Sequence, residues 1–244
     1  MMTKERFDAI CLEEAERAEG VRAGIGTYSE KRLHRVLKRW VSEDPATHEV
    51  AVGQSIADVR TEEGIFEIQT GSLRPLLPKL RRYLEETDCP ITVILPLLSP
   101  KRVIRMDRET GEILRHRRVF QGGRMLDGAV RLYPIAELLR EPRLRVILVR
   151  LEAEEYRYSE RVRYRREGAF ESELFPRCLV ETILLNSPED YRVLLPKEES
   201  FCASDYGAWS KLKKRDLYSA LNLFCALGIL RREAEGRKYR YYQT

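Results

Sequence analysis

The sequence lacks the cysteine pattern of a disulfide framework or a zinc site. Its five cysteines are odd in number and widely scattered, and no two of them form a C-x-x-C pair. A disulfide framework typically has an even number of cysteines, and structural zinc sites typically have closely spaced ligand pairs such as C-x-x-C. We therefore expect five reduced cysteines, at Cys11, Cys89, Cys178, Cys202 and Cys225.

Long apolar runs are also absent. The longest, at residues 91–98, has the length of a strand and contains Pro96, whereas a membrane-spanning helix needs about 20 apolar residues. The first residues, Met-Met-Thr-Lys-Glu-Arg, do not contain the apolar region of a signal peptide. The sequence therefore predicts no membrane partner and a cytoplasmic location.

Composition and charge indicate a folded protein with a basic end. Hydrophobic residues make up 43% of the 244 residues and charged residues 34%, which is enough apolar surface for one large core or two smaller ones. Of the net charge of +5, residues 197–244 carry +4 and the first 196 residues only +1. This asymmetry favours a basic C-terminal module with a polyanionic partner.

Hydrophobic periodicity predicts an α/β fold. Apolar residues recur at helical spacing in some segments, whereas other segments alternate or form short apolar runs, as strands do. We expect helices over residues 3–19, 28–41, 76–86, 126–139 and 179–185. We expect strands over residues 48–52, 55–60, 64–70, 91–98, 103–106, 112–118 and 144–151.

Two carboxylates should face each other in the second hairpin. Alternation along residues 64–70 places Glu67 and Gln69 on one face, with Phe66 and Ile68 toward the core. If the turn has two or four residues, positions whose numbers sum to 125 are paired, and Asp58 lies opposite Glu67 with Cβ atoms about 4.5–5.5 Å apart. Adjacent carboxylates repel unless a cation lies between them, so this pair predicts a site for a hard cation.

This arrangement resembles the active site of the PD-(D/E)xK nuclease superfamily over residues 28–98. In that superfamily an acidic residue on a helix, an Asp on one strand and an E-x-K on the next surround one or two magnesium ions. The matching residues are Glu30, Asp58 in Ile-Ala-Asp-Val and Glu67 in Phe-Glu-Ile-Gln. The resemblance implies a restriction-endonuclease-like mixed sheet flanked by helices, with Mg²⁺ (or Mn²⁺) held by these three side chains.

The sequence departs from the superfamily pattern at two positions. Ala57 replaces the Pro and Gln69 replaces the Lys. Gln occurs at that position in some members, and a basic residue can migrate to a neighbouring element. Lys79, on the helix that follows the strand, is our candidate for the missing cation. The implied catalytic set is therefore Glu30, Asp58, Glu67, Gln69 and Lys79.

Structural roles would also account for these residues. Thr27-Tyr-Ser-Glu30 has the form of a capping box, so Glu30 could satisfy backbone donors, with or without metal binding. Asp58 and Glu67 could form a solvated strand pair, although opposed like charges would then destabilise the hairpin. Gln69 could be only a hydrogen-bonding neighbour, and a lone histidine such as His34 is more often structural than catalytic.

The C-terminal segment resembles a winged helix. A short helix over residues 204–209, a turn and a longer helix over 213–227 are followed by Gly228 and a basic hairpin over 229–232 and 237–242. Cations on such a helix can hold phosphates and an amide can read base edges, although winged helices also dock proteins. The cluster of Tyr239, Tyr241 and Tyr242 is expected to pack in the wing. The candidate DNA-binding residues are Lys213, Lys214, Arg215, Tyr218, Asn222, Arg237 and Lys238.

Together these patterns predict a nuclease-like domain over residues 1–196 and a small C-terminal winged helix over 197–244. The expected function is metal-dependent hydrolysis of DNA phosphodiesters. The alternative is an inactive nuclease-fold regulator that binds DNA, which the missing motif Lys favours. Many nucleases of this fold act as dimers, which makes a homodimer a further hypothesis, although no segment identifies an interface.

Overall fold

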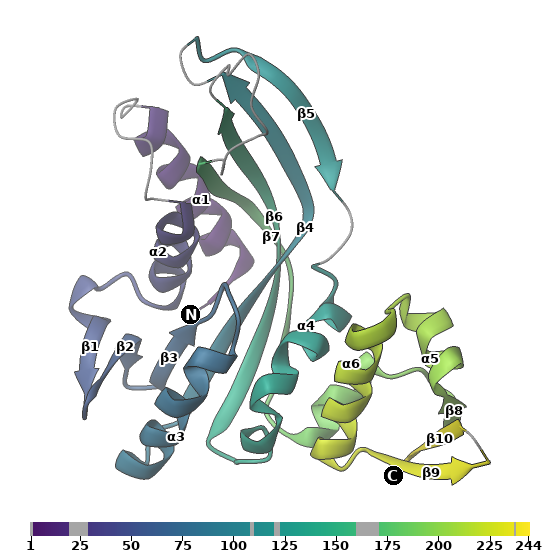
Figure 1. The fold of residues 1–244 in the computed structure, drawn as a ribbon. Helices are drawn as coiled ribbons and strands as arrows, with labels where there is room; N and C mark the ends of the chain where they lie inside the picture. Colours follow the sequence, from purple (N-terminus) through teal and green to yellow (C-terminus); the bar gives the residue numbers. More distant parts are fainter. Residues whose placement is uncertain (1, 20–28, 108–109, 120–122, 160–170, 237) are drawn as a thin grey trace.

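A computed structural model of the chain describes residues 2–19, 29–107, 110–119, 123–159, 171–236 and 238–244. Its fold is α/β, as the sequence predicts. In these residues seven strands form one mixed sheet with helices on both faces (Figure 1). No described helix combines the length and the apolar character that crossing a bilayer requires.

The sheet has the order β1-β2-β3-β4-β6-β7, and β5 pairs with the far half of β4. The central strands β3, β4 and β6 are parallel, whereas the other pairs are antiparallel. The strands are β1 (His48–Val52), β2 (Ser55–Thr61), β3 (Gly64–Ile68), β4 (Ile91–Asp107), β5 (Ile113–Val119), β6 (Leu144–Ser159) and β7 (Glu171–Leu185).

The strand β4 is one long strand, whereas the sequence predicts separate strands at 91–98 and 103–106. Its pairing with β6 shifts between Leu98 and Lys101 and then continues. A local irregularity thus takes up the two intervening residues without ending the strand. Because β6 also runs past its predicted end at Leu151, β4 to β7 extend beyond the helices as a curved arm (Figure 1).

Two helix predictions need correction. Residues 179–185 belong to β7, which pairs with β6 from Val146↔Leu185 to Tyr158↔Glu171. A short apolar run fits a strand or a helix equally, and this long-range pairing decides between them. The helix expected over 126–139 divides into α4 (Met125–Leu132) and a 3-10 helix, η3 (Tyr133–Leu138), near Pro134.

Helices cover both faces of the sheet. On one face, α1 (Lys4–Glu19) and α2 (Ser29–Val41) pack on β7 and share a core with Phe66 and Ile68 of β3. On the other, α3 (Leu77–Glu86) and α4 contribute to the larger core, which includes Leu80 and Tyr83. The short 3-10 helices are η1 (Pro45–Thr47), η2 (Arg74–Leu76) and η4 (Pro188–Leu194). All five cysteines are free.

The C-terminal elements pack against α4 and η3. The helices α5 (Ala203–Ser210) and α6 (Lys214–Leu227) precede the hairpin of β9 (Leu230–Glu235) and β10 (Lys238–Gln243). A short strand that the sequence analysis missed, β8 (Ser200–Cys202), pairs with β10. Tyr241 is buried and stacks on Phe201 of β8, as expected for a packing role. Apolar residues of α6, including Phe224, belong to the same core as those of α3 and α4.

Candidate functional site

The hairpin of β2 and β3 has the register that the sequence predicts. The observed pairs Val59↔Phe66 and Arg60↔Ile65 both sum to 125, so Asp58 and Glu67 occupy the next opposed positions. Gly64 begins β3 with φ +127°, and a Cβ there would lie 2.2 Å from the carbonyl oxygen of Pro90. Only glycine fits this close approach. The turn therefore fixes which residues of the two strands meet.

Asp58 lies where the backbone pairing of β2 with β3 ends. Its Oδ2 accepts a hydrogen bond from the backbone N–H of Ile68 at 2.7 Å and lies 3.1 Å from Nε2 of His34 on α2. The side chain is 20% exposed, so it is reachable from solvent. His34 was named in the sequence as a structural residue, and it contacts the predicted site directly.

Glu67 is buried, and two side chains of α3 hold its carboxylate. The residue is 3% exposed. Its Oε2 lies 2.7 Å from Nζ of Lys79, and its Oε1 accepts a hydrogen bond from the hydroxyl of Tyr83 at 3.0 Å. Lys79 and Tyr83 are four residues apart and therefore share one face of the helix. Lys79 thus reaches the site as proposed, whereas Tyr83 was not predicted to belong to it.

The two carboxyls respond differently to this environment. Burial and the charge of Asp58 raise the pKa of Glu67, although Lys79 and Tyr83 oppose the shift. Burial also opposes ionisation of Asp58, but the hydrogen bonds and charge from His34 and Ile68 outweigh it and lower that pKa. Asp58 therefore keeps its negative charge, and the cost of bringing two carboxylates together falls on Glu67.

The other two predicted catalytic residues are Glu30 and Gln69. The backbone of Glu30 lies in the first turn of α2, but its side chain and the capping box proposed for it lie outside the described residues. The Gln69 amide donates to the carbonyl oxygen of Ser72 at 2.7 Å. The structure thus brings together Asp58, Glu67 and Lys79.

The donor set fits a magnesium ion. Asp58 and Glu67 supply carboxylate oxygens, and Oδ1 of Asp58 makes no hydrogen bond within the described residues. Magnesium prefers hard oxygen ligands and is often held by one or two carboxylates plus several waters. No group of three or more His, Cys, Asp and Glu side chains suited to a metal gathers in the part of the chain that the structure describes. A metal ion at this pair would bind a Glu67 carboxylate that also pairs with the Lys79 ammonium.

A buried arginine on α4 fixes the segment that follows β3. Nη2 of Arg131 donates to the carbonyl oxygens of Gln69, Thr70 and Gly71, and Nη1 donates to the carbonyl oxygen of Pro96. Burial lowers the pKa of Arg131 to about 10. Because four carbonyl oxygens accept hydrogen bonds from this cation, Arg131 holds the backbone of residues 69–71 against that of Pro96. No signal in the sequence marked it.

A groove of about 1180 Å³ extends from residues 70–71 to the turn between α5 and α6. Its lining includes Thr70 and Gly71 as well as Lys211 and Lys213. Lys211 has φ +59°, the left-handed conformation that commonly ends a helix, and its backbone N–H caps α5 by donating to the carbonyl oxygen of Gly207. Five lysines and arginines line the groove against three acidic residues: Lys101, Arg124, Arg131, Lys211 and Lys213 against Asp127, Glu155 and Asp216. The groove is therefore positively charged.

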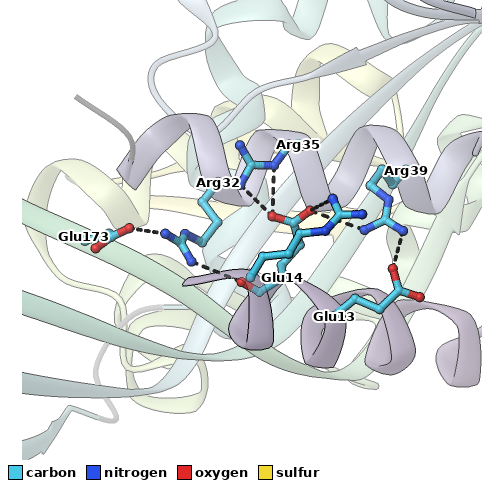
Figure 2. Close-up of polar contacts among 7 residues, drawn as sticks. Glu13, Glu14, Arg32, Arg35, Arg39 and Glu173 are labelled. Carbon is cyan, nitrogen blue, oxygen red and sulfur yellow. Dashed lines mark hydrogen bonds and ion pairs between the residues drawn. The ribbon is translucent and has the colours of Figure 1, made fainter. Parts of the chain in front are cut away.

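A cluster of arginines ties α2, which carries His34, to α1. The carboxylate of Glu14 on α1 is buried and accepts hydrogen bonds from Arg35 and Arg39 of α2 and from Arg17 of α1 (Figure 2). Arg32 extends the cluster by contacting Glu173 of β7. These contacts fix α2 against the sheet, and so they help to position His34 at Asp58.

The predicted DNA-binding residues begin α6 and continue onto β10. Lys213, Lys214 and Arg215 are exposed at the start of the helix. Tyr218 is 53% exposed, and Asn222 is half-buried. Lys238 is exposed on β10, whereas Arg237 lies outside the described residues. The basic start of α6 therefore faces solvent at the end of the groove.

Comparison with known proteins assigns no activity. Residues 31–186, more than half of the chain, match the family model described as "Domain of unknown function (DUF8091)". The matched region includes Asp58, Glu67 and Lys79 and ends before the C-terminal helices. No curated protein and no solved structure matches the sequence.

Proposed function

The chain belongs to the family described as a domain of unknown function (DUF8091), and we propose that this protein is a metal-dependent DNA nuclease. The observation that carries the proposal is the convergence of Asp58 and Glu67, with the Lys79 ammonium 2.7 Å from the Glu67 carboxylate. Two carboxylates can hold a metal ion that activates water, and a nearby cation can stabilise charge on a phosphate, which are two ways to promote phosphodiester hydrolysis. Binding to DNA, a homodimeric state and a cytoplasmic location stay predictions.

The groove supports DNA as the substrate. It is positively charged, and its lining includes Thr70, three residues after Glu67 in the chain, and the exposed Lys211 and Lys213 before α6. Asp58, Glu67 and Lys79 are not among the described residues that line it. Backbone phosphates supply most of the nonspecific affinity of DNA for proteins, and lysine and arginine side chains bind them. A DNA strand in this groove would contact residues 70–71, which Arg131 holds in place.

The residues of the site have separate roles in the proposed reaction. Asp58 and Glu67 would hold Mg²⁺ (or Mn²⁺), with Glu30 contributing directly or through water. The ion, when bound, lowers the pKa of the attacking water and neutralises charge on the scissile phosphate. Lys79 would stabilise the negative charge that develops on the phosphate. His34 and the backbone of Ile68 hold Oδ2 of Asp58, and Oδ1 makes no hydrogen bond within the described residues.

A catalytically inactive DNA-binding regulator is the second candidate. The Lys79 ammonium already neutralises Glu67, and Gln69, at the position of the motif Lys, is bonded to Ser72. Because Lys79 offsets the charge of Glu67, the site is stable without a metal ion. The fold alone does not distinguish an enzyme from its inactive relative.

A cleavage assay distinguishes the two. The protein is incubated with supercoiled plasmid and with single- and double-stranded oligonucleotides, with Mg²⁺, with Mn²⁺ and with EDTA. A nuclease converts at least one substrate only when the metal is present. DNA binding without cleavage of any substrate would establish the regulator instead.

Divalent metal should raise the melting temperature. A ligand that binds only the native state at 100 times its Kd stabilises it by about 2.7 kcal/mol, so Mg²⁺ or Mn²⁺ should shift the transition upward. Asp58→Asn should remove the shift, because the amide can still accept the Ile68 bond but loses the negative charge. Differential scanning fluorimetry checks this, with Glu62→Gln in the exposed hairpin turn as control. A full shift in Asp58→Asn would place the ion elsewhere.

Removing the cations of α6 should weaken DNA binding. Each lost phosphate contact lowers the magnitude of the slope of log K against log salt by about 0.9 for duplex DNA. Lys214→Ala with Arg215→Ala should therefore reduce it by about 1.8. Fluorescence anisotropy across a salt series measures the slope, and Arg140→Ala with Lys197→Ala removes the same charge from exposed positions outside α6. Equal slopes for both double variants would exclude α6 from the DNA contact.

A further inference from the structure

The arm of the sheet carries a row of arginines. In the antiparallel pairing of β4 with β5, Arg105 lies directly opposite Arg115. In the parallel pairing of β4 with β6, Arg105 lies abreast of Arg157. Arg117 is two positions from Arg115 on the same strand, so it projects from the same face. Four arginines from three neighbouring strands therefore share one face of the arm.

These arginines surround a hollow. Its volume is about 90 Å³, and it is lined by the four arginines together with Val103. We call it the arginine hollow. Glu155, which lies abreast of Val103 in the sheet, is 2.7 Å from Arg157 and 2.6 Å from Lys101. Among the described residues, Arg115 and Arg117 have no hydrogen-bond or ion-pair partner. Arg115 and Arg117 thus bring positive charge to the arginine hollow that no described acid pairs with.

Edge protection explains only part of this pattern. β5 is an edge strand, and exposed charges on such strands discourage pairing with other chains. That role needs charge on the strand but no particular face, and Arg118 on the opposite face would serve it equally. It does not account for like charges placed abreast on three strands, which by themselves destabilise a sheet. An anion in the arginine hollow would remove this repulsion.

The arginine hollow is continuous with the positively charged groove. Lys101 pairs with Val119 two positions along from Val103 and Arg117, on the same face of the sheet. Lys101, Val119 and Glu155 line the groove. From there the groove reaches the basic turn between α5 and α6. One face of the molecule therefore carries cations from the arm to the C-terminal helices.

We propose that the arginine hollow binds a phosphate group of a nucleic-acid strand that continues through the groove. A guanidinium is planar and binds two phosphate oxygens at once, which makes arginine suited to this contact. The inference rests on nucleic acid as the partner in the proposed function. It adds a phosphate-binding surface remote from α6 and from the carboxylate pair.

The test compares neighbouring arginines on opposite faces of β5. Arg115→Gln and Arg117→Gln should each flatten the salt dependence of duplex binding, and the double variant should flatten it by about 0.9, the contribution of one phosphate. Arg118→Gln removes the same charge one residue away on the other face, and it should leave the slope unchanged. Binding is measured by anisotropy with EDTA, so that cleavage does not occur, and melting temperatures confirm that the variants fold.

The outcomes separate this inference from the nuclease proposal. Slopes that are equal for Arg117→Gln and Arg118→Gln would overturn the inference, whether or not the protein cleaves DNA. A protein that never cleaves but shows the expected slopes would keep the inference and lose the nuclease activity. A parallel titration uses inorganic phosphate alone. If Arg115 and Arg117 matter for that titration but not for DNA, the site takes a small phosphate ligand and the nucleic-acid assignment is wrong.

Discussion

Glu14→Gln should destabilise the protein by about 3 kcal/mol, near the lower end of the cost of breaking a buried ion pair. The Glu14 carboxylate is 3% exposed and accepts hydrogen bonds from three arginines. Without its charge, the cations of α1 and α2 would repel each other. The cost stays near the lower end because Arg17 and Arg35 are 68% and 45% exposed, so water stabilises them in part. For a chain of this length, the melting temperature should fall by about 6–12 °C.

The neighbouring residue supplies the control. Glu13 is 51% exposed and pairs with Arg39, and an exposed pair contributes less than about 1 kcal/mol. Glu13→Gln should therefore have a small effect in the same chemical or thermal denaturation experiment. A similar loss for both variants would show that burial of Glu14 does not matter.

The Glu14 effect should also depend on pH. Burial opposes ionisation of Glu14, but the hydrogen bond and charge of Arg35, with Arg17 and Arg39, outweigh it and lower its pKa. A lowered pKa means that the stabilisation is present above the unfolded value, near 4.3, and is lost as the pH falls through the folded value. Wild type and Glu14→Gln should therefore differ at neutral pH and converge in acid.

The second large effect is on catalysis: Glu67→Gln should lower cleavage by on the order of 10²- to 10³-fold, as removal of one group that stabilises transition-state charge does. The amide can still accept the Tyr83 hydrogen bond, but it loses the charge that would hold the metal ion. DNA affinity should change little, since the cations of the groove and α6 remain. Plasmid cleavage and anisotropy check both results, and Glu85→Gln on the exposed face of α3 is the matched control. Undiminished cleavage by Glu67→Gln would place the chemistry elsewhere.

Lys79→Met separates positioning from metal binding. Lys79 opposes the rise in the pKa of Glu67 that burial and Asp58 cause. Without the ammonium that pKa should rise further, so the acid limb of the pH–rate profile should move to higher pH. A residue that only packed α3 against the sheet would lower the rate without moving this limb.

Much of the site follows from local sequence. Strand alternation and the short turn ending at Gly64 determine the hairpin register, which brings Asp58 opposite Glu67. Lys79 was proposed because it begins the next helix, and it contacts Glu67. Tyr83 was missed because an aromatic residue on the inner face of an amphipathic helix is expected to pack in the core, and Tyr83 does so while its hydroxyl binds Glu67.

By itself, the sequence determined the α/β class, most helices and strands and the hairpin that carries the carboxylates. These features depend on the order of residues within one helix or one turn, where the backbone geometry is known in advance. Only the tertiary structure decided that residues 179–185 form a strand, that Glu14 meets Arg35 and that three strands set arginines abreast. Each of these depends on pairing or packing between segments far apart in the chain, and the local pattern of residues does not specify which segments meet.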